Sequence, residues 1–185
     1  MGPHDPDLIR RWQQGDPRAF EDLVRRWEQP VARLLGRLVG RSDMVQDLSQ
    51  EVFLKVHAAR PRYRDNGHFA TWLYRITLNV ARDAGRRLRR DPAAWQGPEP
   101  PDRAPPAEER CQRAEAAEAV ARAVAELPAP LREVLVLHHY EGLNFEQIAR
   151  LTGTPASTLK SRFTAALGRL RTRLHELGWN PEETP

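Results

Sequence analysis

Residues 143–174 read LNFEQIARLTGTPASTLKSRFTAALGRLRTRL and carry the clearest local pattern of the chain. Asn144 stands three residues before Gln147, an arrangement that resembles a capping box and starts a helix. Gly153 ends this short helix, and we expect Thr154 to cap a second helix that has Pro155 at its first position. An apolar stripe then follows the second helix, at Leu159, Phe163, Leu167, Leu170 and Leu174. Two helices joined by a short turn that contains glycine predict a helix-turn-helix.

The second helix of a helix-turn-helix places its N-terminal residues in the major groove of DNA. In this chain those positions hold small polar and basic side chains, which let the backbone approach DNA while the cations reach guanine or phosphate. The candidate contacts to duplex DNA are Ser157, Thr158, Lys160, Ser161 and Arg162. The alternative is an ordinary helical hairpin within a small bundle.

The remainder of the chain also favours helix, because alternating strand patterns are absent and helix-forming residues dominate outside one proline-rich segment. That segment, residues 91–112, holds six prolines and suits neither a helix interior nor a central strand. The sequence therefore predicts an all-α fold with two small helical domains, at residues 8–90 and 113–176, joined by a Pro-rich acidic linker. The helix-turn-helix lies in the C-terminal domain.

Two local features of the first domain also lead to expectations. Pro30 lies inside an apolar run at helical spacing, and we expect it to kink or interrupt that helix. Ser42 or Asp43 can cap the helix that follows, whose core stripe holds Val45, Leu48, Val52 and Val56.

Charge is distributed unevenly along the 185 residues, although the net formal charge is only +4. Residues 60–90 hold nine arginines against two aspartates, and residues 154–175 hold five Lys and Arg with no acid. Seven acids at 91–118 separate these blocks. Dense basic blocks of this kind indicate a polyanionic partner such as nucleic acid.

Several function classes are excluded by what the sequence lacks. A single cysteine, Cys111, allows no internal disulfide framework and no cysteine-based zinc finger. The six histidines show no HExxH spacing, and neither a Gly-rich phosphate loop nor a nucleophile elbow is present. We therefore expect no enzyme, no metal and no cofactor. Without an apolar run of roughly 18–20 residues or a signal peptide, we expect a cytoplasmic protein with no membrane insertion.

Residues 69–79 read FATWLYRITLN and combine aromatic side chains with the first basic block. Aromatic rings can stack on bases while arginine follows the phosphate backbone, which is the chemistry of single-stranded DNA binding. The candidates are Phe69, Trp72, Arg75, Asn79 and Arg82. The alternative is that Phe69, Trp72 and Ile76 are core residues, which we expect for Ile76.

A second surface is indicated at residues 47–57, DLSQEVFLKVH. Asp47, Gln50 and Leu54 share one helical face, apart from the core stripe. A polar face with one exposed apolar residue suits a partner helix, although a merely solvated face is the alternative.

Three blocks in this order resemble a bacterial RNA polymerase sigma factor of the extracytoplasmic-function (ECF) group, within the sigma-70 family. The blocks are AFEDLVRRW with DLSQEVFLKVH, then FATWLYRITLNVARD, then LPAPLREVLVLHHYEGLNFEQIARLTGTPASTLKSR. The resemblance covers roughly residues 8–175. It implies promoter-specific transcription initiation, with core RNA polymerase, promoter DNA (duplex and melted single strand) and an anti-sigma factor as partners.

The resemblance also assigns roles to residues. It implies that core polymerase docks on Asp47, Gln50, Glu51, Phe53 and Leu54. It implies that the segment with Phe69, Trp72, Arg75, Asn79 and Arg82 melts the minus-ten element and captures a flipped base. The helix-turn-helix residues would read the minus-thirty-five element.

The chain departs from the family pattern in one segment, and another class of DNA-binding protein has a similar helix-turn-helix. Thr164 to Leu167 hold no cation where many relatives carry one, which predicts weaker and less salt-sensitive minus-thirty-five binding. The main competitor is a LuxR-type regulator, whose helix-turn-helix reads similarly but which does not need the two N-terminal blocks. An antagonist that only mimics a sigma factor is a further alternative.

Overall fold

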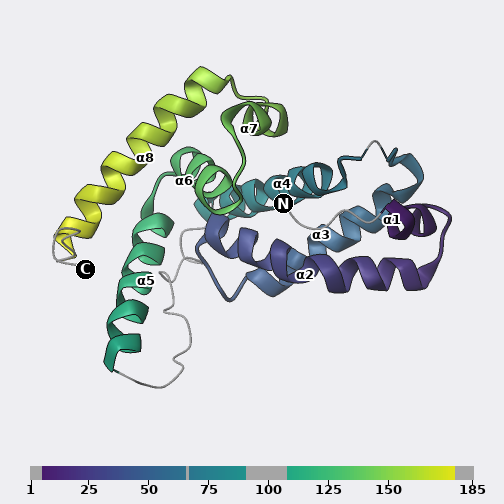
Figure 1. Ribbon diagram of the computed structural model, residues 1–185, viewed down its shortest axis with the longest axis horizontal. Coiled ribbons are helices and arrows are strands. Elements are labelled where there is room, and N and C mark those ends of the chain that lie inside the picture. Colours follow the sequence, from purple (N-terminus) through teal and green to yellow (C-terminus); the bar gives the residue numbers. More distant parts are fainter. Residues whose placement is uncertain (1–5, 66, 91–107, 178–185) are drawn as a thin grey trace.

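The structure, a computed structural model, describes residues 6–65, 67–90 and 108–177, with side chains from residue 117 onward in the last segment (Figure 1). The described residues form helices and turns without strands, so the predicted all-α class is confirmed. Most of the predicted linker, 91–112, lies outside the described residues. The helix that follows begins at Glu108, inside the predicted linker.

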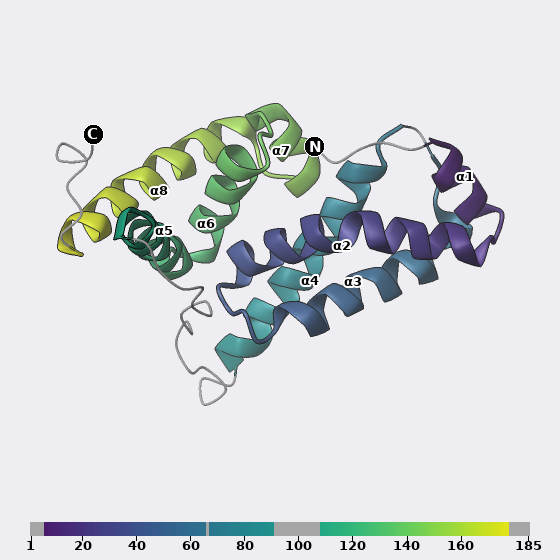
Figure 2. The ribbon, with the colours of Figure 1, turned by 60° about the horizontal axis from the view of Figure 1, so that its bottom comes forward.

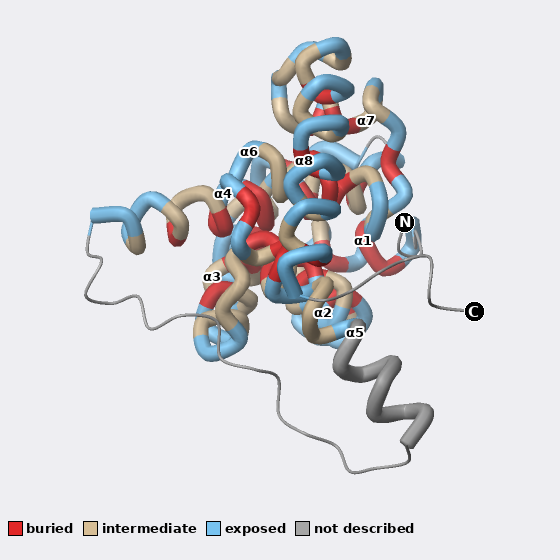
Figure 3. The backbone as a smooth tube through the Cα atoms, turned by 90° about the vertical axis from the view of Figure 1, so that its left-hand side faces the viewer, coloured by how far each residue is buried: buried red, intermediate tan, exposed pale blue. Residues whose placement is uncertain are grey.

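The N-terminal half consists of α1 (Pro6–Gln13), α2 (Pro17–Val39), α3 (Val45–Ala59), the short 3-10 turn η1 (Arg60–Arg62) and α4 (Phe69–Arg90). Helices α2 and α3 lie side by side, α4 crosses and contacts both, and α1 packs on one end of α2 (Figure 2). Their buried faces meet in one core, drawn in red in Figure 3.

Helix α2 runs unbroken through Pro30, so the expected interruption is wrong. Buried side chains stand on both sides of the proline, among them Trp27 and Val31, which are 2% and 0% exposed. Their burial outweighs the one amide hydrogen bond that proline removes.

Helix α3 begins with Met44 as its N-cap and no side-chain capping bond, so the expected cap by Ser42 or Asp43 is wrong. The Asp43 carboxylate accepts hydrogen bonds from Arg41 instead, which also lowers the pKa of Asp43.

The C-terminal half consists of α5 (Glu108–Glu126), α6 (Ala129–Leu135), the π-helical turn η3 (Val136–Tyr140), α7 (Phe145–Thr152) and α8 (Ala156–Glu176). The capping box of α7 is confirmed: Gln147 N donates to Asn144 Oδ1, and Asn144 N donates to Gln147 Oε1, both at 2.9 Å. Gly153 ends α7 at φ +73, a conformation that favours glycine.

The helix-turn-helix is therefore present as α7 and α8. Its second N-cap differs from the expectation, because Pro155 is the N-cap of α8 and no side chain caps it. Thr154 uses its backbone N–H to bond the Thr152 hydroxyl at 3.2 Å and does not cap α8.

The two halves pack against each other. Helix α2 contacts α5 and α6, and α4 contacts α7, so the buried residues of both halves belong to one cluster. Figure 1 shows α7 above α4 and α5 beside the C-terminal end of α2.

Candidate nucleic-acid and polymerase interfaces

The first aromatic residue of α4 lies in the core. Phe69 is 2% exposed, and its ring centroid lies 5.8 Å from those of both Trp27 and Tyr63 and 6.1 Å from that of Trp12. In this arrangement Phe69 has almost no surface to offer DNA. For this residue the structure agrees with the alternative reading, that of a core aromatic.

Trp72, by contrast, lies at the edge of the aromatic cluster. Its ring is 4.5 Å from that of Tyr63, and its outer part lines a groove between the C-terminal end of α3 and α4. We call this the α3–α4 groove. Its volume is about 530 Å³, and its lining residues are Lys55, Ala59, Trp72, Ile76, Asn79, Arg82, Asp83 and Arg86.

The α3–α4 groove brings together three of the five candidates on α4: Trp72, Asn79 and Arg82. It also adds two cations, Lys55 and Arg86, that sequence reasoning did not nominate. Arg86 belongs to the basic block and could have been found by its spacing from Asn79, seven residues along the helix. Lys55 comes from α3, so only the packing of the two helices reveals it.

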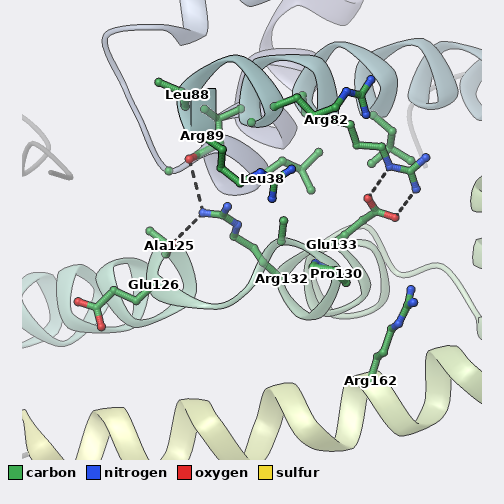
Figure 4. Close-up of a pocket in the computed structure, with 17 residues that line it drawn as sticks. Leu38, Arg82, Leu88, Arg89, Ala125, Glu126, Pro130, Arg132, Glu133 and Arg162 are labelled. Carbon is green, nitrogen blue, oxygen red and sulfur yellow. Dashed lines mark hydrogen bonds and ion pairs between the residues drawn. The ribbon is translucent and has the colours of Figure 1, made fainter. Parts of the chain in front are cut away.

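Both arginine candidates on α4, Arg75 and Arg82, reach toward the C-terminal half. Arg75 Nη2 donates to the backbone carbonyl of Arg150 in α7 at 3.1 Å. Arg82 makes a two-pronged contact with Glu133 of α6, from Nε to Oε2 at 2.8 Å and from Nη2 to Oε1 at 2.6 Å (Figure 4). The hydrogen bond with Glu133 raises the pKa of Arg82.

Arg82 also lines a second hollow, of about 800 Å³, between the two halves. We call it the central pocket. It is bounded by the end of α2, by α4 and by α5 and α6, and Arg162 of α8 points into it from below in Figure 4. Its cationic lining is Arg82, Arg86, Arg89, Arg132 and Arg162.

Arg132 is a half-buried cation of this pocket, and its burial lowers its pKa. Its Nη1 donates to Ala125 O at 2.8 Å and to Val39 O at 3.5 Å. These carbonyls belong to the C-terminal turns of α5 and α2, where helix dipoles favour a positive charge. A single guanidinium thus joins the ends of two helices from different halves.

The outer face of α3 holds the predicted polymerase-docking residues. Asp47 and Gln50 are exposed, and Leu54 is 64% exposed, the largest value among the exposed large apolar residues. Glu51 is more enclosed and pairs with Lys55 at 3.3 Å and with Arg87 at 3.4 Å. Phe53 packs partly against the core.

The N-terminal turns of α8 present most of the predicted duplex-DNA residues. Ser157, Lys160 and Ser161 are exposed, and Thr158 and Arg162 are half-buried. Leu159 is 2% exposed and anchors the inner face of the helix.

His138 supports this arrangement from η3, a role the sequence did not suggest. Its Nδ1 lies 2.8 Å from Leu143 O, just before the N-cap of α7. Its ring stacks on Phe145 of α7 at 4.4 Å and meets Phe163 of α8 edge-on at 4.7 Å. One side chain therefore contacts both helices of the helix-turn-helix.

Within the described part of the chain no group of His, Cys, Asp and Glu is arranged to hold a metal ion. Of the helices built from those residues, none combines the length and apolar character needed to span a bilayer.

Comparison with known families gives matches in both halves. The model of sigma-70 region 2 matches residues 23–91, and that of sigma-70 region 4 matches residues 117–170. The RNA polymerase sigma-H factor of Pseudomonas aeruginosa is 33% identical over 178 residues, covering 88% of this chain and 89% of that protein. The ECF RNA polymerase sigma-E factor of Haemophilus influenzae is 32% identical over 180 residues, covering 92% and 95%.

Solved structures show the same fold. CnrH in complex with the cytosolic domain of CnrY matches with a TM-score of 0.68 at 23% identity, over 92% of this chain and 96% of that one. RpoE in complex with the anti-sigma factor NepR, from Bartonella quintana, matches with a TM-score of 0.63 at 21% identity, over 84% and 96%. Because the relatives align across both halves, the LuxR-type alternative is not favoured. The chain belongs to the extracytoplasmic-function group of the sigma-70 family of RNA polymerase sigma factors.

Proposed function

We propose that this sigma factor binds core RNA polymerase, recognises a two-part promoter and opens the DNA at the minus-ten element. In this proposal residues 8–90 form the region-two-like domain and residues 113–176 the region-four-like domain. The protein supplies specificity to a catalytic partner in the cytoplasm and is not itself an enzyme. Family membership supports the general role, and the residue assignments below rest on geometry.

The α3–α4 groove is the observation that carries the proposal. A half-buried tryptophan, Trp72, and an exposed amide, Asn79, line one hollow together with Lys55, Arg82 and Arg86. Stacking on an aromatic ring stabilises a bound base by about 1–3 kcal/mol, which can offset the few kcal/mol that unstacking costs. We assign base contacts to Trp72 and Asn79 and strand-phosphate contacts to the cations. Phe69 acts as a core residue that supports Trp72, and Arg75 lies outside the groove.

The minus-thirty-five element is assigned to the start of α8. Ser157, Lys160 and Ser161 are exposed there, beside the half-buried Thr158 and Arg162. The small Ser and Thr side chains let the backbone of α8 come close to DNA, and the two cations can reach guanine edges or phosphates.

Core polymerase is assigned to the outer face of α3. Leu54 is an exposed apolar side chain on the same face of α3 as the exposed polar residues Asp47 and Gln50. Burying Leu54 against a partner helix would remove its apolar surface from water, with Asp47 and Gln50 at the rim. Glu51 and Phe53 contribute mainly by shaping α3, since one pairs within the chain and the other packs on the core.

An anti-sigma factor is proposed as a further partner. Support comes from the related fold of RpoE, which was solved bound to the anti-sigma factor NepR.

Run-off transcription tests the proposal directly. Purified bacterial core RNA polymerase is supplied with a pooled promoter library, with and without this protein. We expect protein-dependent transcripts that share two upstream elements. Binding to duplex DNA as a dimer without joining core polymerase would favour a LuxR-type regulator, and core binding without initiation would favour an antagonist.

A further inference from the structure

Several side-chain contacts between the two halves join a donor of the N-terminal half to a carboxylate of the C-terminal half. Tyr74 Oη donates to Glu141 Oε2 at 2.8 Å, and Arg37 Nη1 lies 3.6 Å from Glu141 Oε1; the Arg132–Val39 contact runs in the opposite direction. The Arg37 guanidinium also lies over the Tyr140 ring, 4.4 Å from its centroid. The Arg82–Glu133 pair is the shortest of the ionic contacts in this set.

The backbone is adapted to the same contact. Gly40 follows α2 at φ +73, and a Cβ built there would lie 2.9 Å from Ala125 Cβ of α5. A side chain at this position would push the halves apart, so the close approach of α2 and α5 depends on glycine. The contact between the halves is therefore specific packing, with defined donors and acceptors.

Arg82 has a double position in this arrangement. It lines the α3–α4 groove, where DNA is proposed to bind, and also the central pocket, where it meets Glu133. The Nε and Nη2 donors of Arg82 both face the Glu133 carboxylate. A phosphate held by the same edge of the guanidinium would need those donors, because carboxylate and phosphate are matched by the same planar fork.

We propose that Glu133 is an intramolecular competitor of DNA, which occupies Arg82 in the closed arrangement and suppresses DNA binding by the free protein. Binding of the melted strand then requires that the Arg82–Glu133 contact open. Separation of α4 from α6 would release the guanidinium to the groove while Glu133, 17% exposed in its side chain here, returns to water. This inference rests on the proposed role of the α3–α4 groove in binding DNA.

Replacing Glu133 with Gln tests the competition, and the chain offers a matched control. Glu126 lines the same central pocket but pairs with Arg173, within the C-terminal half, at 2.6 Å. E133Q and E126Q therefore remove the same charge from the same hollow, and only E133Q frees a donor of the N-terminal half. Binding is measured by fluorescence anisotropy of the full-length protein with a labelled single-stranded DNA of mixed sequence.

We expect E133Q to bind this DNA about fivefold more tightly than the wild-type protein, while E126Q changes by less than about twofold. The salt dependence of E133Q should steepen by about 0.7, the slope for one added phosphate contact on a single strand. The double variant E133Q/R82A should lose this gain in DNA affinity and bind DNA with the same affinity as R82A. Equal binding by E133Q and E126Q, or no binding by any form, would overturn the proposal.

Two further measurements keep the outcome decisive. Thermal unfolding checks that E133Q is folded. The variant Y74F removes the donor to Glu141 while keeping the buried ring, and it should also tighten DNA binding, by a smaller factor.

Run-off transcription separates the two proposals. If the wild-type protein initiates with core polymerase but E133Q gains nothing on DNA, only the competition fails; if E133Q gains but no form initiates, only the sigma assignment fails.

Discussion

Trp72 and Asn79 lie seven residues apart on α4 and line the same α3–α4 groove, while Phe69, three residues before Trp72, is buried in the core with its ring centroid 5.6 Å from that of Trp72. The half-buried ring and the exposed amide thus line one hollow about two helical turns apart. This placement separates the residues proposed to contact DNA from those that hold the fold.

Replacing Asn79 with Ala should impair promoter opening and spare binding of core polymerase. A bidentate amide–base contact discriminates by about 1–3 kcal/mol, so we expect opening to fall by about tenfold or more. Permanganate reactivity of the minus-ten thymines measures opening, and gel-shift of the core complex is the control. Unchanged thymine reactivity would contradict the assignment of Asn79.

Phe69 should behave as a core residue. Phe69→Ala should lower the free energy of unfolding by about 3–5 kcal/mol, the usual cost of truncating a buried Phe. Phe69→Leu should lose less stability and retain promoter opening once folded. Chemical denaturation and the permanganate assay decide this. A folded Phe69→Leu protein that fails to open DNA would contradict this prediction and indicate that Phe69 contacts DNA.

Leu54 should contribute to polymerase binding without contributing to stability. Its side chain is 64% exposed, so Leu54→Ala should leave the unfolding midpoint almost unchanged. Loss of a buried leucine at an interface should weaken binding to core polymerase by about tenfold or more. Leu167→Ala, at a leucine of α8 that is 43% exposed, is the matched control and should bind normally. Equal binding by both variants would remove Leu54 from the interface.

Changing Lys160 and Arg162 together to Ala should weaken promoter binding and leave polymerase binding intact, because the two surfaces lie in different halves. If both cations contact phosphates, the slope of log K against log salt should become shallower by about 0.9 for each. Arg171→Ala, at an exposed arginine nearer the C-terminus of α8, is the control for general charge loss. Joint loss of promoter and polymerase binding in the folded variant would contradict this separation.

Asp16 should make the protein less stable as the pH falls into the acid range. Its side chain caps α2 by accepting from Arg18 N, and its hydrogen bond with Arg11 is the main cause that lowers its pKa below the ordinary 3.8. A lowered folded-state pKa stabilises the protein above pH 3.8, and this stability is lost as the pH falls through the folded-state value. Asp16→Asn should therefore unfold with a flatter pH dependence below about pH 5. Thermal melts of the wild-type and Asp16→Asn proteins at pH 3 to 6 measure this. The same dependence of melting temperature on pH in both proteins would contradict the prediction.

Local signals along the chain were sufficient for much of the fold. The Asn144–Gln147 capping box, the stop at Gly153 and the stripe of α3 all concern residues within a few positions of one another, and the structure has each of them. Asp43 failed as a cap because its carboxylate is occupied by Arg41, a competitor that the capping rule does not consider.

The site was less accessible to sequence reasoning because it depends on contacts across the fold. Helical spacing grouped Phe69 with Trp72, but the ring of Trp12, from α1, contacts both, and the ring of Trp27, from α2, encloses Phe69 further. The Arg82–Glu133 pair joins residues 51 positions apart, on either side of the proline-rich segment. No periodicity in the sequence indicates such a partner.

Arg132 has a consequence for how the halves come apart. Its partners are the neutral carbonyls of Val39 and Ala125, whereas Arg82 holds a charged carboxylate. Dissolved ions weaken the attraction between two full charges more than the attraction between one charge and neutral peptide carbonyls. A rise in ionic strength therefore weakens the Arg82–Glu133 contact more than the Arg132 contacts, so α4 can separate from α6 while α2 and α5 stay in contact.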